Sequence, residues 1–325
     1  MREAEVIARL RRIATAPEAR GLMDDVAVIG GLVITHDSIA EGVHFLPGDP
    51  PASVGWKLVA VNLSDLAAKG AEPAGALLSL TLAGSGEWEA QFLDGVEAAC
   101  ETFGLPLIGG DTLALPPGAP RVLGMTVIGN AGERVPDRSG GEPGDVLWLV
   151  GMLGDSAAGL AQLQGDPAAG GVLVEAYRRP IPLLVAGRAL APLARAMMDV
   201  SDGLLLDASR MADASACTIA IELDALPLSN AFIEERGASR DARLFAATGG
   251  DDYALLAALD PGFDPATLCL PTGTMITRIG RLEPGAGRVT ISWRSEPVEL
   301  PERLGFEHHG AQRPGPPHSP VADRH

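Results

Sequence analysis

Short apolar runs alternate along the chain with glycine-rich turns and with longer segments that have helical periodicity. The runs 26–29 and 32–35 are separated only by Gly30-Gly31, which is typical of a tight β-hairpin. Asp25 immediately precedes the first run, and Asp37 follows shortly after the second. Because the two strands of a hairpin lie side by side at its open end, this pattern predicts two neighbouring carboxylates.

Helical periodicity follows over residues 53–70, where Ser53 is the expected N-cap and Gly70 the expected C-terminal cap. Polar residues at helical spacing form one stripe in this segment, made by Asn62, Asp65 and Lys69. Further helices are predicted over 88–103, 156–164, 183–195 and 204–214, and further strands over 76–82, 105–108, 122–128, 146–150, 196–200, 218–223, 253–259, 276–282 and 288–293. This mixture predicts an α/β (α+β mixed) protein.

A segment rich in glycine, proline and charge, residues 131–144, divides the chain into two halves. Its composition is typical of a linker, and 325 residues suffice for two domains of ordinary size. We therefore expect an N-terminal domain over residues 1–136 and a C-terminal domain over residues 137–307. Residues 308–325 are rich in Gly, Pro and His, and we expect a disordered tail there.

The chain is strongly acidic, with 42 Asp and Glu against 25 Lys and Arg. This balance argues against nucleic acid as a partner. No apolar run approaches the roughly 20 residues of a membrane span, and the charged N-terminus predicts an amphipathic helix rather than a signal peptide. The three cysteines are widely spaced and suggest no disulfide framework. These features favour a cytoplasmic protein with no membrane partner.

Acidic residues recur beside glycine or at the ends of apolar runs. A carboxylate next to a buried strand is costly unless its charge is compensated, and the bases are too few to pair with all the acids. Mg²⁺ prefers carboxylates together with water and phosphate oxygens. The acidic signals are Asp24-Asp25, Thr35-His36-Asp37, Asp65, Gly109-Gly110-Asp111, Asp155, Asp199, Ser201-Asp202 and Gly249-Gly250-Asp251-Asp252. They suggest an Mg²⁺-rich site for a polyanionic substrate.

Familiar phosphate-binding patterns do not occur in the sequence. The only two lysines, Lys57 and Lys69, do not follow glycine, which excludes a Walker A loop. The protein-kinase motifs and GxSxG are also absent. A Gly-Gly-Asp turn lets the backbone approach a phosphate closely while its Asp reaches a metal ion. One such turn alone would more often be an ordinary turn, but two of them together with Ser201-Asp202-Gly203 favour a site.

A series of motifs covers most of residues 24–260. They read DDVAVI, ITHDSIAEGVHFLP, GWKLVAVNLSDLAAKGAEP, LIGGDT, RSGGEPGD, GDSAAGL, MDVSDGLLLD and TGGDDYALL. Together they resemble the thiamine-monophosphate kinase family, within the aminoimidazole ribonucleotide synthetase-like superfamily. The resemblance implies a two-domain α/β fold and a homodimer formed through the N-terminal domain. It also implies an ATP- and Mg²⁺-dependent transfer of the γ-phosphoryl group to thiamine monophosphate, giving thiamine diphosphate.

The resemblance implies a role for each matching position. Metal ligands would be Asp25, Thr35, His36, Asp37, Asp65, Asp111, Asp199 and Asp202. ATP contacts would be Gly110, Asp111, Arg138 and Ser201, and contacts with thiamine monophosphate would be His44, Asp251 and Phe306. No catalytic side chain is expected, because the acceptor is a phosphate monoester with a second pKa of about 6 and is already largely a dianion. Several Mg²⁺ ions would relieve the repulsion between two polyanions.

Four positions depart from the family pattern. His36 stands in place of Thr, Asp251 in place of Glu, and Leu113-Ala114 in place of Thr-Arg. Imidazole is a poorer Mg²⁺ ligand than oxygen, although the backbone carbonyl of His36 remains suitable. Two alternatives therefore stay open: another ATP-dependent enzyme of the superfamily, and a non-catalytic protein that binds Mg²⁺ and nucleotide. Outside these roles, Asp155 is the expected N-cap of the helix at 156–164 and Asp252 is expected to be structural.

Overall fold

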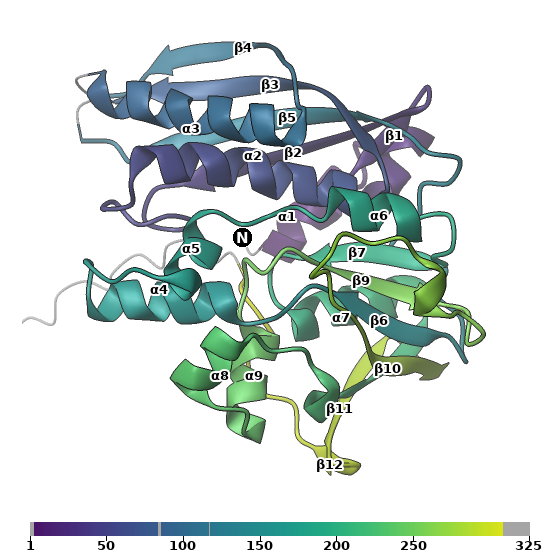
Figure 1. The fold of residues 1–325 in the computed structure, drawn as a ribbon. Coiled ribbons are helices and arrows are strands. Elements are labelled where there is room, and N and C mark those ends of the chain that lie inside the picture. Colours follow the sequence, from purple (N-terminus) through teal and green to yellow (C-terminus); the bar gives the residue numbers. More distant parts are fainter. Residues whose placement is uncertain (1–2, 84–85, 117, 308–325) are drawn as a thin grey trace, which may run out of the picture.

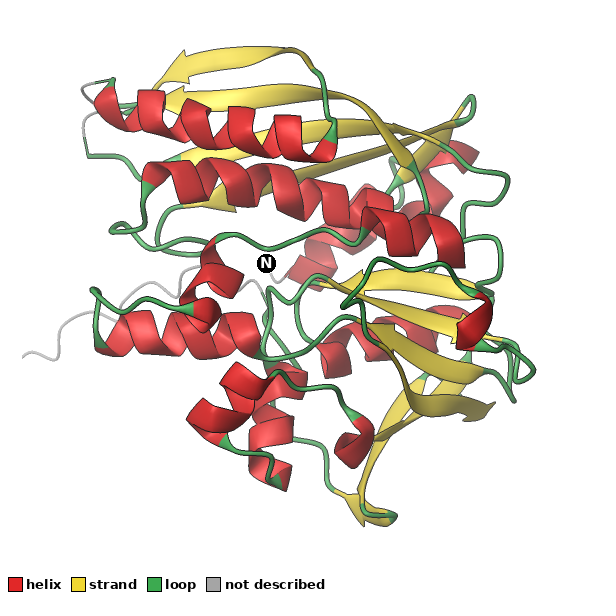
Figure 2. Cartoon of the chain, viewed as in Figure 1, coloured by secondary structure: helices red, strands yellow, loops and turns green. Residues whose placement is uncertain are grey.

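The computed structural model describes residues 3–83, 86–116 and 118–307, and it contains two β-sheets with helices between and around them (Figures 1 and 2). The first sheet has the strand order β1-β2-β5-β3-β4, and the second has the order β12-β11-β8-β10-β6-β9-β7. Each sheet has its own buried apolar core. The expected mixed α/β, two-domain class is confirmed. The tail expected at residues 308–325 lies outside the described residues.

The predicted hairpin is formed by β1 (Ala27–Ile29) and β2 (Leu32–Ala40), which pair antiparallel. The second strand was expected to end at Thr35, but it continues for five more residues. The reason is long-range, because β2 pairs over its whole length with β5 (Val122–Asn130). Asp37 therefore lies inside β2 rather than after it.

The outer part of the first sheet consists of β3 (Glu72–Leu82) and β4 (Leu107–Ala114), which pair parallel. The strand expected over 105–108 was predicted to stop before Gly109-Gly110-Asp111, and this is wrong because pairing with β3 carries the strand through these residues. A Cβ on Gly110 would lie 2.0 Å from the carbonyl oxygen of Leu78, so only glycine fits there. All eight residues of β4 are exposed.

One face of the first sheet is covered by α2 (Pro51–Ala68) and α3 (Glu87–Phe103) (Figure 1). Ser53 is not the N-cap, since α2 begins at Pro51 and has no side-chain cap. Both helices end as predicted, with Gly70 and Gly104 in the left-handed region.

The second sheet is built after residue 145 and carries helices that the sequence pattern only partly predicts. Asp155 is not an N-cap, because it is the first residue of α4 and its carboxylate accepts a hydrogen bond from Ser229. The strands are β6 (Val146–Val150), β7 (Ala196–Val200), β8 (Cys217–Glu222), β9 (Ala254–Leu259), β10 (Ile276–Pro284), β11 (Arg288–Trp293) and β12 (Glu296–Val298). The helices are α4 (Asp155–Gly165), α5 (Val172–Arg178), α6 (Leu184–Leu190), α7 (Leu204–Ser215), α8 (Asn230–Arg236) and α9 (Arg240–Thr248), while α1 (Glu3–Leu10) lies at the N-terminus.

The two domains pack against each other along α2, which is buried from Val54 to Ala68. Its last turn belongs to a third apolar cluster with residues of α6, β7 and β9. A Cβ on Gly187 of α6 would lie 1.9 Å from the carbonyl oxygen of Ala67, so the two helices approach very closely. In the described part of the chain, no helix is long and apolar enough to cross a membrane.

Candidate metal and phosphate site

A pocket of about 500 Å³ opens at the junction of the two domains. Its walls come from the β1–β2 hairpin and α2 on one side, and from α4, α7 and the turns after β7 and before β9 on the other. The residues that matter below are Asp25, Asp37, His44, Asp65, Arg138, Ser201, Asp202, Arg210, Asp251 and Phe306, all of which line it. Most of the positions named from the sequence are thus brought together.

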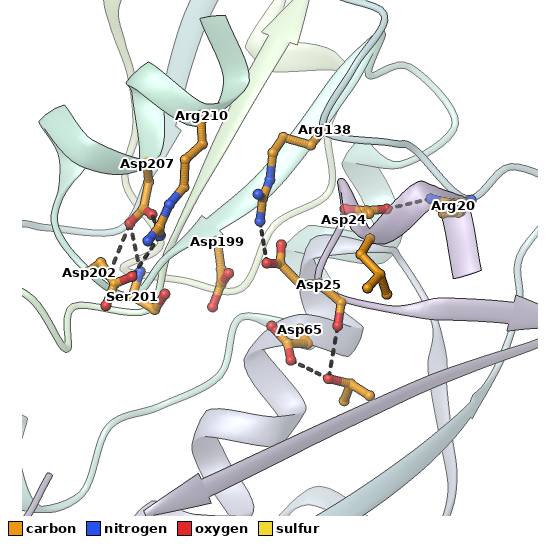
Figure 3. Close-up of polar contacts among 12 residues, drawn as sticks. Arg20, Asp24, Asp25, Asp65, Arg138, Asp199, Ser201, Asp202, Asp207 and Arg210 are labelled. Atoms are coloured by element: carbon orange, nitrogen blue, oxygen red, sulfur yellow. Dashed lines mark hydrogen bonds and ion pairs between the residues drawn. The ribbon is translucent and has the colours of Figure 1, made fainter. Parts of the chain in front are cut away.

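Three carboxylates from three elements meet at the wall of this pocket, which Asp25 and Asp65 line directly while Asp199 is buried beside them. Asp25 enters β1, Asp65 lies on α2 and Asp199 lies on β7, and one oxygen of each is within 4.8 Å of the others. Figure 3 shows the three side chains pointing into one space. Asp65 and Asp199 are buried, and each accepts one hydrogen bond, from Thr35 Oγ1 and, at 2.6 Å, from Ser64 Oγ.

Burial and mutual repulsion perturb these carboxyl groups strongly. Burial, followed by the charges of Asp37 and Asp199, raises the pKa of Asp65 well above its usual value. Burial and the charge of Asp25 raise the pKa of Asp199 to about 8 and that of Asp37 to about 6. Burial alone would raise the pKa of Asp25, but the charges of Arg138 and Lys69 outweigh burial and lower this pKa.

This cluster fits a divalent cation. The Oδ2 atom of Asp25 is buried and, among the described residues, has no hydrogen-bond partner. A buried carboxylate oxygen without a donor is costly, and a cation would compensate for it. The donors are oxygens of carboxylates, which suit Mg²⁺.

Two arginines face the carboxylates from the C-terminal half. The guanidinium group of Arg138 pairs with Asp25, and its buried Nε has no hydrogen-bond partner among the described residues. Arg210 on α7 pairs through Nη1 with Asp202 at 2.6 Å and with Asp207 at 2.7 Å. Both arginines point at the acidic space in Figure 3.

Asp207 was missed by the sequence reasoning. Its Oδ2 accepts hydrogen bonds from the backbone N–H groups of Ser201, Asp202 and Gly203, at 3.0 to 3.2 Å. It thereby shapes the Ser-Asp-Gly turn that precedes α7. The signal was an Asp four residues after Gly203, one turn into the predicted helix, where a carboxylate can reach back to the free N–H groups.

The pocket is also lined by the three residues expected to contact the acceptor, here called the acceptor end of the pocket. They adjoin the Ser201-Asp202 turn, because the Asp251 N–H donates to Ser201 O at 2.7 Å and the Phe306 N–H donates to Asp202 O at 2.9 Å. His44 and Phe306 form an edge-to-face pair with ring centroids 6.4 Å apart, and His44 Nδ1 accepts a hydrogen bond of 3.0 Å from the Ala40 N–H. The Asp251 carboxylate accepts hydrogen bonds from Lys57 Nζ at 2.7 Å and from the Tyr253 hydroxyl at 2.8 Å. Lys57 was not identified from the sequence.

Five of the expected site residues are outside the pocket lining. Thr35 and Asp199 contact residues beside it, whereas Gly110, Asp111 and His36 lie elsewhere on the first sheet. Gly110 and Asp111 lie on the edge strand β4, and β5 and β3 separate this strand from β2. His36 is exposed, and its Nδ1 lies 2.9 Å from Thr126 Oγ1 on β5. Asp252 is outside the pocket lining, and its carboxylate accepts a hydrogen bond from the Gly154 N–H, in keeping with the structural role expected for it.

Protein-family comparison gives matches in both halves of the chain. The description AIR synthase related protein, N-terminal domain, matches residues 23–131, and the corresponding C-terminal domain matches residues 142–287. The thiamine-monophosphate kinase of Caulobacter vibrioides is 36% identical over 323 residues, with 94% of this chain and 90% of that protein covered. That of Escherichia coli (strain K12) is 36% identical over 306 residues, with coverage of 89% and 91%.

Solved structures show the same similarity in three dimensions. The structure described as AaThiL complexed with AMPPCP and TMP gives a TM-score of 0.82 at 31% identity and covers 95% of this chain and 97% of that one. Thiamine-monophosphate kinase from Stenotrophomonas maltophilia K279a gives 0.73 at 33% identity, with coverage of 90% and 96%. The hydrogenase maturation protein HypE in complex with ATP, at 21% identity and a TM-score of 0.70, shares the fold.

Proposed function

Since the chain belongs to the thiamine-monophosphate kinase family of AIR synthase related proteins, we propose that it transfers the γ-phosphoryl group of ATP to thiamine monophosphate. The products would be thiamine diphosphate and ADP. The observation that carries the proposal is one pocket that is lined both by Asp25 and Asp65 of the Asp25–Asp65–Asp199 cluster and by His44, Asp251 and Phe306. The relative solved with AMPPCP and TMP supports this choice of substrates.

Asp25, Asp65 and Asp199 would hold Mg²⁺, with Asp37 and Asp202 available beside them. Bound there, Mg²⁺ would supply the charge neutralisation that two polyanionic substrates need. Thr35 would orient Asp65 through its hydroxyl rather than bind metal with it. His36 would contribute at most its backbone carbonyl, because its imidazole lies on β2 away from the pocket lining.

Arg138, Ser201 and Arg210 would contact the phosphates of ATP. The free Nε of Arg138 and the Nη2 of Arg210, which makes no hydrogen bond to the described residues, are donors suited to phosphate oxygens. The acceptor phosphate is already largely a dianion near neutral pH, so no general base is needed. The chain's residues would therefore act by orientation and charge, in a direct in-line transfer without a covalent enzyme intermediate.

We also propose that two chains assemble through the first sheet into a homodimer. The protein would act in the cytoplasm, and its two domains would be residues 1–136 and 137–307. Apolar side chains are exposed on this sheet at Leu77, Leu107, Leu113 and Val122, each at least 40% accessible. A surface of this kind is typical of an interface. Gly110 and Asp111 lie on the same sheet, so their expected roles toward ATP and metal would require the partner chain. Light scattering that gives a single-chain mass would overturn this assembly.

The experiment that tests the activity is a product assay on the purified chain with ATP, thiamine monophosphate and Mg²⁺. Equal amounts of thiamine diphosphate and ADP, formed only with Mg²⁺, support the proposal. Turnover of a different acceptor, but not of thiamine monophosphate, would favour another ATP-dependent enzyme of the superfamily. Binding of Mg²⁺ and ATP without any turnover would favour a non-catalytic binding protein.

A further inference from the structure

The two lysines of this chain are both buried, Lys57 on α2 and Lys69 at the C-cap of that helix. Lys69 pairs with Asp24 at 2.5 Å and donates to the carbonyl oxygen of Met197 at 3.1 Å, so it joins the two domains away from the acceptor end of the pocket. Lys57 lies three turns earlier, and its side chain is 2% exposed. A buried ammonium group is costly unless it is paired and fully hydrogen-bonded, so its partners indicate why it is there.

The partners of Lys57 are the residues that form the acceptor end of the pocket. Its Nζ donates to Asp251 Oδ2 at 2.7 Å and to the carbonyl oxygen of His44 at 3.0 Å. It also lies 4.0 Å from the centroid of the Tyr177 ring, which is a cation–π contact. One ammonium group therefore ties together two residues from different domains that line the same end of the pocket.

The segment that carries Asp251 is strained. Asp251 and Tyr253 have φ angles of 66° and 51°, in the left-handed region that residues other than glycine rarely adopt. The segment is held to the end of β7 by hydrogen bonds from Asp251 N to Ser201 O, at 2.7 Å, and from Tyr253 N to Val200 O, at 2.8 Å. Such a backbone persists only where its surroundings fix it, and Lys57 and the Tyr253 hydroxyl fix the carboxylate at its tip.

We propose that Lys57 is a positioning residue for the acceptor, an inference that rests on the proposed function. It holds Asp251 and His44 at a fixed separation and cancels the charge of Asp251. The Asp251 side chain is 27% exposed, so it still offers a lone pair to the pocket. The acceptor end is then a rigid, electrically neutral surface that accepts a hydrogen bond from an N–H donor on the organic part of the acceptor. Lys57 touches neither the metal cluster nor the proposed ATP contacts.

The test is a comparison of Michaelis constants in the full chain. For Lys57→Met, the KM for thiamine monophosphate should rise by about tenfold or more, as expected when a hydrogen bond to a charged group is lost. The KM for ATP should stay within about twofold of the wild-type value, because Lys57 donates to His44 and Asp251 and to none of the proposed ATP contacts. Asp251→Asn should act in the same direction, and the double variant should be less impaired than the product of the two single effects.

Lys69→Met is the matched control, because it removes the other buried ammonium group, at the C-cap of α2, and leaves the contacts of Asp251 intact. It should not raise the KM for thiamine monophosphate relative to that for ATP. If Lys57→Met does not fold in a thermal unfolding assay, Lys57→Gln keeps a polar group there, removes the charge, and should show the same selective rise. An unchanged KM for thiamine monophosphate in a folded Lys57 variant, or an equal rise for both substrates, overturns the inference. A wild-type chain that forms no thiamine diphosphate overturns the proposed function instead.

Discussion

Replacing Asp65 by Asn removes one charge from the carboxylate cluster while it keeps the size of the side chain. Its carboxylate lies within 4.8 Å of those of Asp25 and Asp199, and two unit charges at that separation repel by about 3.5 kcal/mol at an effective dielectric constant of about 20. Burial and these neighbours already raise the pKa of Asp65, so its ionisation costs free energy in the folded metal-free protein, a cost that Asn does not have. The metal-free variant should therefore be at least as stable as the wild type, and more stable at alkaline pH.

The same substitution should abolish most of the activity. Loss of a residue that only supports a metal ligand costs roughly 10- to 100-fold, so loss of a ligand shared by the cluster should lower kcat/KM by at least about 100-fold. The assays are ADP release and thermal unfolding with and without Mg²⁺. Asp252→Asn is the control, because Asp252 lies outside the pocket lining, and this variant should keep the wild-type response to Mg²⁺. An Asp65→Asn variant that stays within a few-fold of wild-type activity, or is still stabilised by Mg²⁺ like the wild type, would refute the metal assignment.

Three further expectations concern pH, ATP and the C-terminus. In the metal-free protein the pKa of Asp199 is raised to about 8 from an ordinary 3.8, so the folded state retains a proton that the unfolded chain has lost. The free energy of unfolding should therefore fall as the pH rises toward 8, and Mg²⁺ should offset the loss. Thermal unfolding between pH 6 and 9, with and without Mg²⁺, measures this. A metal-free protein whose unfolding temperature does not change with pH would count against it. Arg138→Met should raise the KM for ATP by about tenfold and that for thiamine monophosphate much less, since its free Nε is a donor for phosphate; equal changes in steady-state kinetics would contradict this. Deleting residues 308–325 should leave kcat and both KM values unchanged, because every residue assigned to the site above lies at or before Phe306, and an inactive truncation would show otherwise.

The elements that could be predicted from the sequence are those whose signals are local. The Gly30-Gly31 hairpin and the helix closed by Gly104 were found because each depends on a few adjacent residues. The lengths of β2 and β4 were wrong because pairing with β5 and β3, which are distant in sequence, extends both strands. The short helices α5, α8 and α9 were missed, although Ser229 and Ser239 cap two of them and gave a usable signal.

The candidate site also combines residues that have a local sequence signal with residues whose position depends on long-range packing. Local acidic motifs identified Asp25, Asp65 and Asp199, but only the packing of α2 against β7 brings these carboxylates together. Lys57 gave no signal, because its function depends on a contact with Asp251 nearly two hundred positions away, at 2.7 Å. The position of Asp111 on an exposed edge strand was also beyond local reasoning, since it follows from the pairing of β4 with β3.

The most direct measurement is a crystal structure of the chain with Mn²⁺, AMPPCP and thiamine monophosphate, with the metal located by its anomalous scattering. We expect a metal between Asp25, Asp65 and Asp199 at about 2.0–2.2 Å from carboxylate oxygens, with Arg138 released from Asp25 onto a phosphate. Nucleotide bound without metal at this cluster, or Arg138 still paired with Asp25 while both substrates are bound, would contradict the account.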